Sequence, residues 1–360
     1  AMGEAEDDVF LDELYQRALG RPIDPEGLRT FGAMLAAGES RVSVILEVAR
    51  SDECVNRLLS DRFALPSLVE LRPDRFPTEA TRDGAKQIPV YVAETAEDFD
   101  WIERGVLDHG YYEKPGIWSL GVDLDKQVMA ECLAAFAPTL GLEMGCASGA
   151  VLQCLAAQGV VSEGVEISSM AIARAASEVR PRIHHGDVLD LDLAPDYDLV
   201  FGLDIFEHLN PNRLDTYLSR LRDLLVPGGF LFANVPAYGT DPVFGEVFPL
   251  YLESWVADAS AGRPFRRLHV DDDGYPLHGH LIWADTTWWV GRFEAAGLRR
   301  EPRVEEALHA RYDPWLLEAA PARRAFFVFS RDATGDAVDA VVARASVPST
   351  VLADRMPAGV

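Results

Sequence analysis

The sequence predicts an α/β fold, with a seven-stranded, mainly parallel sheet that ends in an antiparallel hairpin and is preceded by a small all-α domain. From Leu140 onward, strand patterns alternate with helix patterns, which is typical of a parallel sheet with helices on both faces. From Val9 to about Asn56, apolar residues recur at helical spacing instead. A chain of 360 residues with 48% hydrophobic content is long enough for one large core and a smaller second unit.

The first unit is predicted to be a helical bundle over residues 4–60. Gly20-Arg-Pro-Ile-Asp-Pro-Glu-Gly27 and Gly38-Glu-Ser40 mark its connections, because Gly and Pro interrupt helices while Asp or Ser can cap the next one. The phrase Leu14-Tyr-x-Arg-x-Leu-Gly-Arg-x-x-Asp-x-x-Gly-Leu28 resembles a short bacterial module of undefined function related to phycobilisome-linker-type helical domains. This resemblance implies nothing about chemistry, although the bundle is a candidate for protein interaction.

The rest of the chain divides into three parts. Prolines and mixed charges predict an extended linker over residues 61–93. The α/β domain follows over residues 94–332. Residues 333–360 are expected to be partly disordered or to form a contact between subunits of a homodimer.

Within the α/β domain, strand and helix patterns follow each other in order. The predicted strands are Leu140–Met144, Glu163–Ile167, Arg182–His184, Leu199–Leu203, Phe230–Val235, Arg300–Leu308 and Ala325–Phe329. The predicted helices are Glu94–Tyr112, Met129–Phe136, Ala150–Ala157, Met170–Val179, Asn212–Leu225 and Asp285–Ala296. Residues 236–283 form an insertion after the fifth strand, and we expect it to cover a substrate.

The composition excludes several classes of partner. A formal charge of −25 would repel both a nucleic-acid backbone and an anionic membrane surface, so neutral or cationic small molecules fit better. The four cysteines lack Cys-x-x-Cys spacing, which argues against a zinc knuckle and a redox pair. Because no signal peptide and no membrane-spanning run are seen, we expect a soluble cytoplasmic protein.

Acidic and small residues follow the first three predicted strands, at the edge where an open parallel sheet binds its ligand. Glu143 ends the first strand, and Gly145 and Gly149 let a backbone approach a ligand closely. Glu166 closes the second strand, and Asp187 follows the third. These residues predict a nucleotide-like ligand.

Together they resemble the signature of class I S-adenosylmethionine-dependent methyltransferases, over about Leu120 to Ser330. The resemblance implies a Rossmann-like fold, S-adenosylmethionine as cofactor and S-adenosylhomocysteine as product. It implies that Glu143 reaches the amino group of the cofactor, Glu166 the ribose hydroxyls, and Asp187 the adenine amino group. At residue 147 the family more often has glycine, and we expect alanine there to shift the loop slightly. The predicted cofactor-binding residues are Glu143, Gly145, Cys146, Ala147, Gly149, Glu166, Ile167, Asp187, Val188, Leu203 and Asp204.

The competing interpretation is a nicotinamide- or flavin-dependent oxidoreductase, which requires Gly-x-Gly-x-x-Gly against its pyrophosphate. Counting from Gly145, the third position is Ala147 and the sixth is Ala150. The sequence therefore favours a sulfonium cofactor, which has no phosphate to hold.

Two groups of residues are candidates for catalysis. After the fourth strand, Glu207 and His208 resemble a Glu-His pair that lies near the cofactor in many family members, although a helix start capped by Asp204 explains these residues equally well. In the insertion, His278 or His280 is favoured as the base that takes a proton from an acceptor hydroxyl.

Two alternatives stay open for the insertion. If His278 and His280 share one face of a strand, they could bind a divalent cation with Asp271 or Asp272. Otherwise Asp271–Gly274 is a surface turn, and the histidines only form hydrogen bonds within the lid.

Aromatic side chains are common walls for sugar rings and planar acceptors. Tyr111, Tyr112 and Trp118 precede the first strand, where related enzymes often fold a lid over the cofactor. The predicted acceptor-binding residues are Tyr111, Tyr112, Trp118, Glu207, Tyr238, His269, Asp271 and Trp283.

The sequence therefore predicts a methyltransferase that acts on an oxygen of a saccharide or glycosylated small molecule, by in-line transfer with a histidine base. The glycan acceptor rests on analogy with domains that occur beside bacterial glycan-modifying enzymes. The alternatives are methylation of a nitrogen or carbon in a small metabolite, and an interaction protein that binds the cofactor without turnover.

Overall fold

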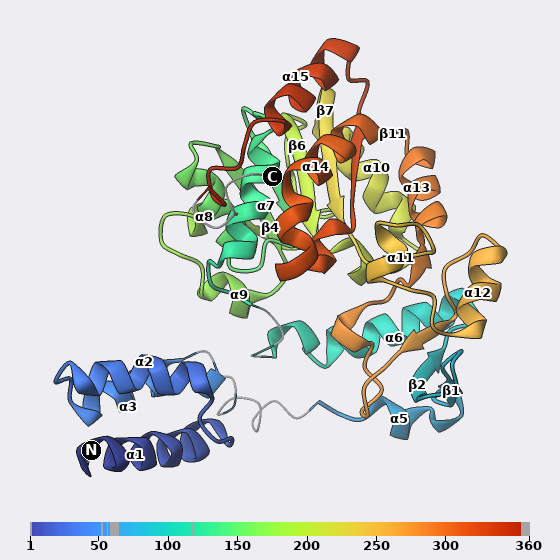
Figure 1. Cartoon of the computed structure of the whole chain (residues 1–360). Helices are drawn as coiled ribbons and strands as arrows, with labels where there is room; N and C mark the ends of the chain where they lie inside the picture. Colours follow the sequence, from blue (N-terminus) through green and yellow to red (C-terminus); the bar gives the residue numbers. More distant parts are fainter. Residues whose placement is uncertain are drawn as a thin grey trace. The chain divides into compact units, whose positions relative to one another are not determined.

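The computed structural model describes residues 2–51, 53–55, 57, 65–114, 116 and 119–353. The chain divides into two compact units, which we describe separately (Figure 1). One unit comprises residues 1–65 with 114–119, and the other comprises residues 66–113 with 120–360. Trp118 lies outside the described residues, so its predicted contact with the acceptor stays a prediction.

The N-terminal unit contains the helices α1 (Met2–Leu19), α2 (Pro25–Ala36) and α3 (Arg41–Arg50). The side chains of Leu11, Tyr15, Val44 and Val48 are buried between them. Residues in the segments predicted to interrupt the helices also cap the helices that follow. Asp24 accepts a hydrogen bond from the amide of Gly27 at 2.7 Å, and Ser40 accepts one from the amide of Ser43 at 3.1 Å.

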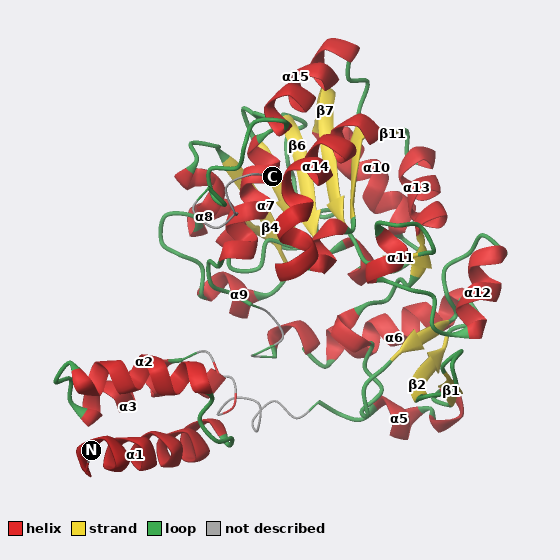
Figure 2. Cartoon of the chain, in the orientation of Figure 1, coloured by secondary structure: helices red, strands yellow, loops and turns green. Residues whose placement is uncertain are grey.

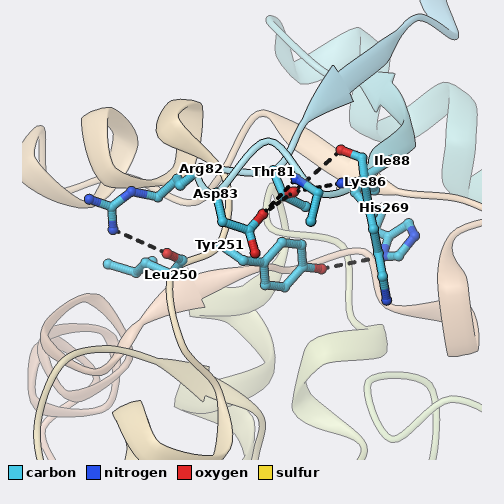
Figure 3. A pocket seen from close by; sticks show the side chains of 9 residues that line it. Thr81, Arg82, Asp83, Lys86, Ile88, Leu250, Tyr251 and His269 are labelled. Atoms are coloured by element: carbon cyan, nitrogen blue, oxygen red, sulfur yellow. Dashed lines mark hydrogen bonds between the residues drawn. The ribbon is translucent and has the colours of Figure 1, made fainter.

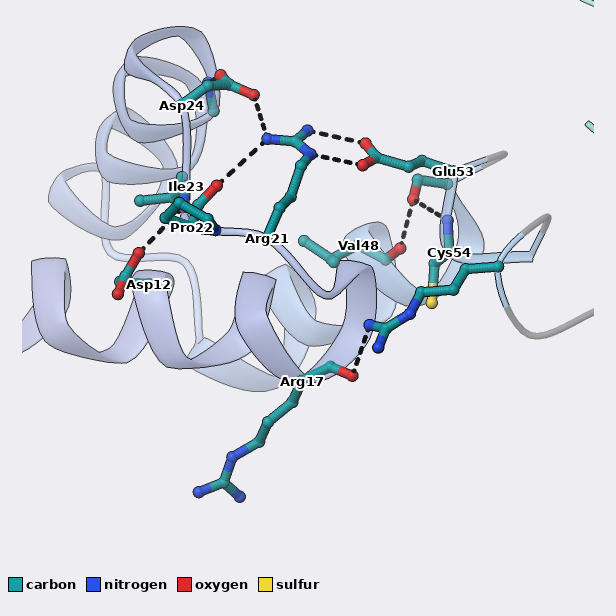
Figure 4. A network of polar contacts seen from close by, with 12 residues as sticks. Asp12, Arg17, Arg21, Pro22, Ile23, Asp24, Val48, Glu53 and Cys54 are labelled. Atoms are coloured by element: carbon teal, nitrogen blue, oxygen red, sulfur yellow. Dashed lines mark hydrogen bonds and ion pairs between the residues drawn. The ribbon is translucent and has the colours of Figure 1, made fainter. Parts of the chain in front are cut away.

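Arg21 belongs to the segment Leu14–Leu28 that resembles the bacterial module, and it has a structural role (Figure 4). Its guanidinium donates to the two carboxylate oxygens of Glu53 at 2.6 and 2.9 Å and to Asp24 at 2.7 Å. It also lies 5.2 Å from the ring centroid of Tyr15. One side chain thus joins the connection between α1 and α2 to the segment that follows α3.

The second unit is built on a seven-stranded sheet with the order β11-β12-β7-β6-β3-β4-β5 (Figure 2). Its strands are β3 (Gly141–Met144), β4 (Ser162–Glu166), β5 (Ile183–His185), β6 (Tyr197–Leu203), β7 (Leu225–Asn234), β11 (Arg299–Arg300) and β12 (Phe326–Ser330). The five strands from β3 to β7 pair in parallel, while β12 pairs antiparallel with both β7 and β11. The predicted fold class is therefore confirmed.

Alternation along the strands creates the two faces of the sheet. Phe326 and Val328 of β12 join one buried cluster, and Phe327 and Phe329 join the other. The first cluster includes side chains of α7 (Leu124–Ala134), α8 (Ala150–Ala157), α14 (Pro302–Ala319) and α15 (Gly335–Ala345). The second includes side chains of α10 (Leu214–Leu224) and α13 (Thr286–Ala295). Helices thus cover both faces, as a parallel sheet requires.

One expectation for the C-terminal part needs correction. The strand predicted over Arg300–Leu308 is wrong beyond Arg300, because Pro302 starts helix α14, whose residues Val304, Leu308 and Tyr312 are buried at helical spacing. In the tail, described over residues 333–353, a helix is present, and the expected partial disorder or contact between subunits stays a prediction. Helix α15 buries Val338 and Val341 in the first cluster.

A second, smaller sheet joins two distant segments of the chain. Strand β2 (Gln87–Val92) pairs antiparallel with β1 (Thr78–Ala80) and with β9 (Arg267–His269). The residues expected to form an extended linker thus contain two strands, together with α5 (Leu68–Leu71) and η1 (Pro73–Arg75). The insertion is attached to the segment that precedes the large sheet.

The remaining elements are short, apart from α6. They are α6 (Ala96–Asp108), η2 (Tyr111–Glu113), α9 (Ser169–Ala173), η3 (Arg180–Arg182), η4 (Phe206–His208), β8 (Ala237–Tyr238), α11 (Phe244–Val247), α12 (Glu253–Ser260), η5 (Leu277–Gly279), β10 (Ala284–Asp285) and η6 (Pro321–Arg324). In the described part of the chain, every helix is too short or too polar to cross a membrane.

Candidate active site

The loop after β3 turns sharply at the carboxyl end of the sheet. Gly145, Ala147 and Gly149 have φ values of 64°, 48° and 71°, in the left-handed region where alanine is strained. A Cβ atom at Gly145 would lie 2.5 Å from Cδ1 of Ile205, so a side chain there would have to displace Ile205. Gly149 then begins helix α8. Ala147 adopts the backbone that glycine prefers, and its amide donates to Glu166 at 2.8 Å.

Glu143 brings an unsatisfied carboxylate to this loop. Its side chain is buried, and Oε2 has no hydrogen-bond partner among the described residues. Burial, followed by the nearby charge of Glu166, raises the pKa of Glu143 to about 8. A buried acceptor without a partner is costly, so this residue suits a ligand that brings a donor group.

Glu166 holds the loop and the next strand end together. Its two oxygens accept hydrogen bonds from the amides of Ala147 and Ser168, at 2.8 and 2.7 Å. Burial raises the pKa of Glu166, against the lowering effect of these amides. Next to it, Ile167 is 44% exposed and offers an apolar surface at the same edge.

Asp187, which follows the third predicted strand, is also held in place by hydrogen bonds. Asp187 accepts hydrogen bonds from the amide of Leu189 at 3.0 Å and from the hydroxyl of Tyr217. Cys146 is buried in the first hydrophobic cluster, and Val188 is buried in the second. Buried carboxylates and a left-handed loop thus line the carboxyl edge of the sheet, and they fit a cofactor with an amino group and hydroxyls.

Asp204 and Leu203 lie where β6 leaves the sheet. Asp204 has a φ of 53° and forms an ion pair with Arg323, which also donates to Asp125 at 2.8 Å. Leu203 packs against the first buried cluster. The capped-helix interpretation of Asp204 does not describe this residue, because its carboxylate is used by Arg323.

Beyond Asp204, three polar side chains meet in the interior. Glu207 is fully buried, and both of its carboxylate oxygens lack a hydrogen-bond partner within the described residues. Its Oε1 lies 3.6 Å from Nε2 of His280, and the rings of His208 and His280 are 5.0 Å apart. We call Glu207, His208 and His280 the buried cluster.

The backbone and a tyrosine fix the buried cluster. The carbonyl of Glu207 accepts the amides of Leu281 and Ile282, both at 2.8 Å, so the insertion is attached directly to η4. The hydroxyl of Tyr112 lies 3.3 Å from Nδ1 of His208. Burial lowers the pKa of His208 to about 4 and lowers the pKa of His280 well below its usual value. Both imidazoles are therefore neutral at neutral pH.

His278 differs from His280 although it is two residues away. The segment is not a strand, because η5 turns the chain here and His278 has a φ of 57°. His278 is exposed, whereas the side chain of His280 is 14% exposed. Their rings are 5.5 Å apart. The shared face that was expected of a strand is therefore not formed.

The comparison with protein families decides the class of this site. A family described as a methyltransferase domain matches residues 142–231, which run from β3 to β7 and contain Glu143, Glu166 and Asp187. The chain carries a class I methyltransferase domain. The enzyme is S-adenosylmethionine-dependent, and the predicted binding of the cofactor at the carboxyl edge of its sheet stays a prediction. Residues 1–58 match a domain of unknown function, DUF4214, so the phycobilisome-type relation stays a prediction.

Solved structures give weaker likenesses, and no curated protein matches. The 1,6-didemethyltoxoflavin-N1-methyltransferase of Burkholderia thailandensis, solved with bound 1,6-didemethyltoxoflavin and S-adenosylhomocysteine, is 15% identical over 71% of this chain and 100% of its own, with a TM-score of 0.42. CalS10, an amino pentose methyltransferase from Micromonospora echinaspora, is 20% identical over 63% of this chain and 96% of its own, with a TM-score of 0.36. At these scores the likenesses do not bear on the acceptor.

In the methyltransferase, the predicted acceptor residues occupy different environments. Tyr111 and Tyr112 are buried in η2, and Tyr111 stacks on Tyr275 at 5.6 Å. Tyr238 is buried against Trp255 and Trp283, at 4.9 and 5.6 Å, in the interior of the insertion.

The acidic residues predicted in the insertion belong to a turn. Asp271 accepts hydrogen bonds from the amides of Asp273 and Tyr275, at 3.1 and 2.9 Å. Asp272 is exposed. Neither belongs to the buried cluster, which is where potential metal ligands converge in the described part of the chain.

An open cleft of about 530 Å³ was not predicted from the sequence (Figure 3). Its walls come from the turn between β1 and β2 and from the insertion, and they include Thr81, Arg82, Asp83, Lys86, Tyr251 and His269. Of these residues, only His269 is predicted from the sequence to bind the acceptor. The other residues come from parts of the sequence that local patterns do not relate to His269. The pairing of β2 with β9 brings them together.

Proposed function

We propose that this methyltransferase methylates a hydroxyl group of a saccharide or of a glycosylated small molecule, with His278 as general base. The observation that supports it best is the cleft between the β1–β2 turn and the insertion, which combines an aromatic ring with several hydrogen-bonding side chains. Sites for small molecules typically have volumes of about 300–1,000 Å³, and this cleft falls within that range.

The lining of the cleft suits a polyhydroxylated molecule. Arg82 and Lys86 supply donors, and Asp83 supplies acceptors, on one wall. Tyr251 supplies a ring, and its hydroxyl lies 3.3 Å from Nδ1 of His269 (Figure 3). An aromatic face with donors and acceptors around it is a common way to hold a sugar ring.

The cleft is connected to the catalytic candidates by ring contacts. The ring of His269 lies 6.1 Å from that of Trp283, which lies 5.5 Å from that of His280. His280 in turn contacts both His208 and His278. These ring contacts link the lining of the cleft to the insertion histidines, and we infer that an acceptor bound in the cleft extends toward them.

The chemistry divides between the cofactor and the chain. S-adenosylmethionine supplies an electrophilic methyl group on its sulfonium. His278 accepts the proton of the acceptor hydroxyl while the hydroxyl oxygen forms its bond to the methyl carbon. We assign this proton transfer to His278 because its ring is exposed, whereas His280 is enclosed beside Glu207.

The test compares variants with saccharide and phenol acceptors, with release of S-adenosylhomocysteine as readout. His278→Ala should lower kcat by about a hundredfold or more with an unchanged cofactor Kd, and added imidazole should restore part of the activity. Asp273→Ala, in the preceding turn, should stay within about twofold of the unchanged enzyme. Tyr251→Ala should raise KM with little effect on kcat, because it affects acceptor binding alone.

Three outcomes would overturn the proposal. An unchanged kcat in His278→Ala would show that His278 is not the general base. Methylation of a nitrogen or carbon in the acceptor would show that the enzyme does not methylate a hydroxyl group. Tight cofactor binding without turnover on any acceptor would favour a protein that senses the cofactor.

A further inference from the structure

The buried cluster contains a carboxylate that the fold leaves unsatisfied. Glu207 is fully buried, and neither of its oxygens has a hydrogen-bond partner within the described residues. Nε2 of His280 lies 3.6 Å from Oε1 of Glu207, which is longer than a hydrogen bond. A buried carboxylate in this state is rare, because its desolvation is not compensated.

The neighbours of Glu207 are two imidazoles that come from different parts of the chain. His208 follows it in η4, and His280 comes from the insertion, 73 residues after Glu207 in sequence. Potential ligand atoms of the three side chains lie within 4.8 Å of one another. Ligands bonded to one cation at about 2.0–2.2 Å lie about 3–3.5 Å apart, so small side-chain rotations would close the set.

We propose that Glu207, His208 and His280 bind one divalent transition-metal cation. Two imidazole nitrogens and one carboxylate oxygen suit zinc, manganese, cobalt or iron(II) better than calcium, which prefers oxygen ligands alone. Three protein ligands leave at least one coordination position for another molecule, as in catalytic metal sites.

Surrounding residues support the orientation that such a site needs. Tyr112 lies with its hydroxyl 3.3 Å from Nδ1 of His208, an outer contact of the kind that orients metal-binding imidazoles. The carbonyl of Glu207 accepts two amides of the insertion, which fixes η4 against the loop that carries His280. Asp271 and Asp272, the acidic partners predicted from the sequence, are replaced by Glu207 in this set.

The role of the cation rests on the proposed function. A cation at the buried cluster would lower the pKa of an acceptor hydroxyl placed beside it. The hydroxyl proton passes to His278, the oxygen forms its bond to the methyl carbon, and the bond between that carbon and sulfur breaks with its electrons left on sulfur. His278 is outside the ligand set and stays available as base.

The test uses the full chain, freed of metal with a chelator and then titrated with zinc or manganese. Calorimetry should give one bound cation per chain. Glu207→Gln, which keeps the shape of the side chain, should weaken binding by at least about a hundredfold, and His280→Asn should do the same. The control is His278→Asn, an adjacent imidazole outside the cluster, which should bind within about threefold of the unchanged protein.

Each outcome either supports or overturns this site. Absence of binding in the unchanged protein, or equal binding in Glu207→Gln and His280→Asn, would overturn it. Methylation of a saccharide hydroxyl by metal-free protein at the full rate would overturn the catalytic role of the cation while the proposed function stands. Stoichiometric metal binding by an enzyme that methylates nitrogen would support the site and overturn the proposed function instead.

Discussion

Nε2 of His280 lies 3.6 Å from Oε1 of Glu207, although the two residues belong to segments that only the folded insertion brings together. This pair connects the carboxyl end of the large sheet to the loop that carries His278. It also leaves a buried carboxyl group without a hydrogen-bond partner among the described residues, and burial raises the pKa of Glu207 well above its usual value.

Metal should stabilise the folded protein through this pair. A ligand present at a hundred times its Kd raises the free energy of unfolding by about 2.7 kcal/mol if it binds only the folded state. Manganese or zinc should therefore raise the Tm of the chelator-treated protein, as followed by differential scanning fluorimetry. His280→Asn should abolish this shift, and an equal shift in the variant would contradict the assignment.

Glu143 should make stability depend on pH in the absence of cofactor. Its pKa is about 8 in the folded protein and 4.5 when unperturbed, so the folded state keeps a proton that the unfolded chain releases between these values. The free energy of unfolding therefore falls as pH rises from 4.5 to about 8. Glu143→Gln removes this effect, and its Tm should exceed that of the unchanged protein by more at pH 8 than at pH 5. A Tm difference independent of pH would be the contrary result.

Glu166 should control cofactor affinity through the loop it holds. Replacing its carboxylate by an amide in Glu166→Gln sets a donor against the amide of Ala147 or Ser168, and one such charged hydrogen bond contributes about 1.5–3 kcal/mol. Calorimetry should show S-adenosylmethionine bound about 10- to 100-fold more weakly. Glu163→Gln is the matched control, because Glu163 is in the same strand but accepts from His184 and Tyr197. Equal losses in both variants would indicate a general disturbance of β4.

Two glycines of α2 should respond oppositely to alanine. A Cβ at Gly27 would lie 2.3 Å from the hydroxyl of Tyr15, so Gly27→Ala should destabilise the N-terminal unit by about 1–3 kcal/mol. Gly32 has open space around its Cα, and Gly32→Ala should stabilise the helix by up to about 1 kcal/mol. Hydrogen exchange of the amides in α1 to α3 would measure both. Loss of protection in Gly32→Ala would contradict the packing described.

The sequence predicted the large sheet because its signals are local. A continuous apolar run, such as Phe326 to Phe329, marks a strand buried on both faces, and Gly145 and Gly149 mark the turn that a ligand requires. The error at Arg300–Leu308 arose from the same kind of signal. A short apolar run fits a strand or a buried helix equally, and Pro302 at the start of α14 was the feature that distinguishes them.

The acceptor side could not be predicted in this way. Arg82 and His269 line one cleft only because β2 pairs with β9, and Glu207 meets His280 only because the insertion returns to η4. No local periodicity encodes such long-range contacts. The interaction role of the N-terminal bundle also stays a prediction, although Val9, Val42 and Leu46 leave apolar side chains exposed there.

The most direct measurement is the fate of a ¹³C-labelled methyl group supplied on S-adenosylmethionine to the full chain together with a panel of saccharides. The proposed function predicts that nuclear magnetic resonance will find the label as a methyl ether on a saccharide oxygen, and that His278→Ala will lose this signal while still binding the cofactor. Label on a nitrogen or carbon, or no transfer despite cofactor binding, would contradict it.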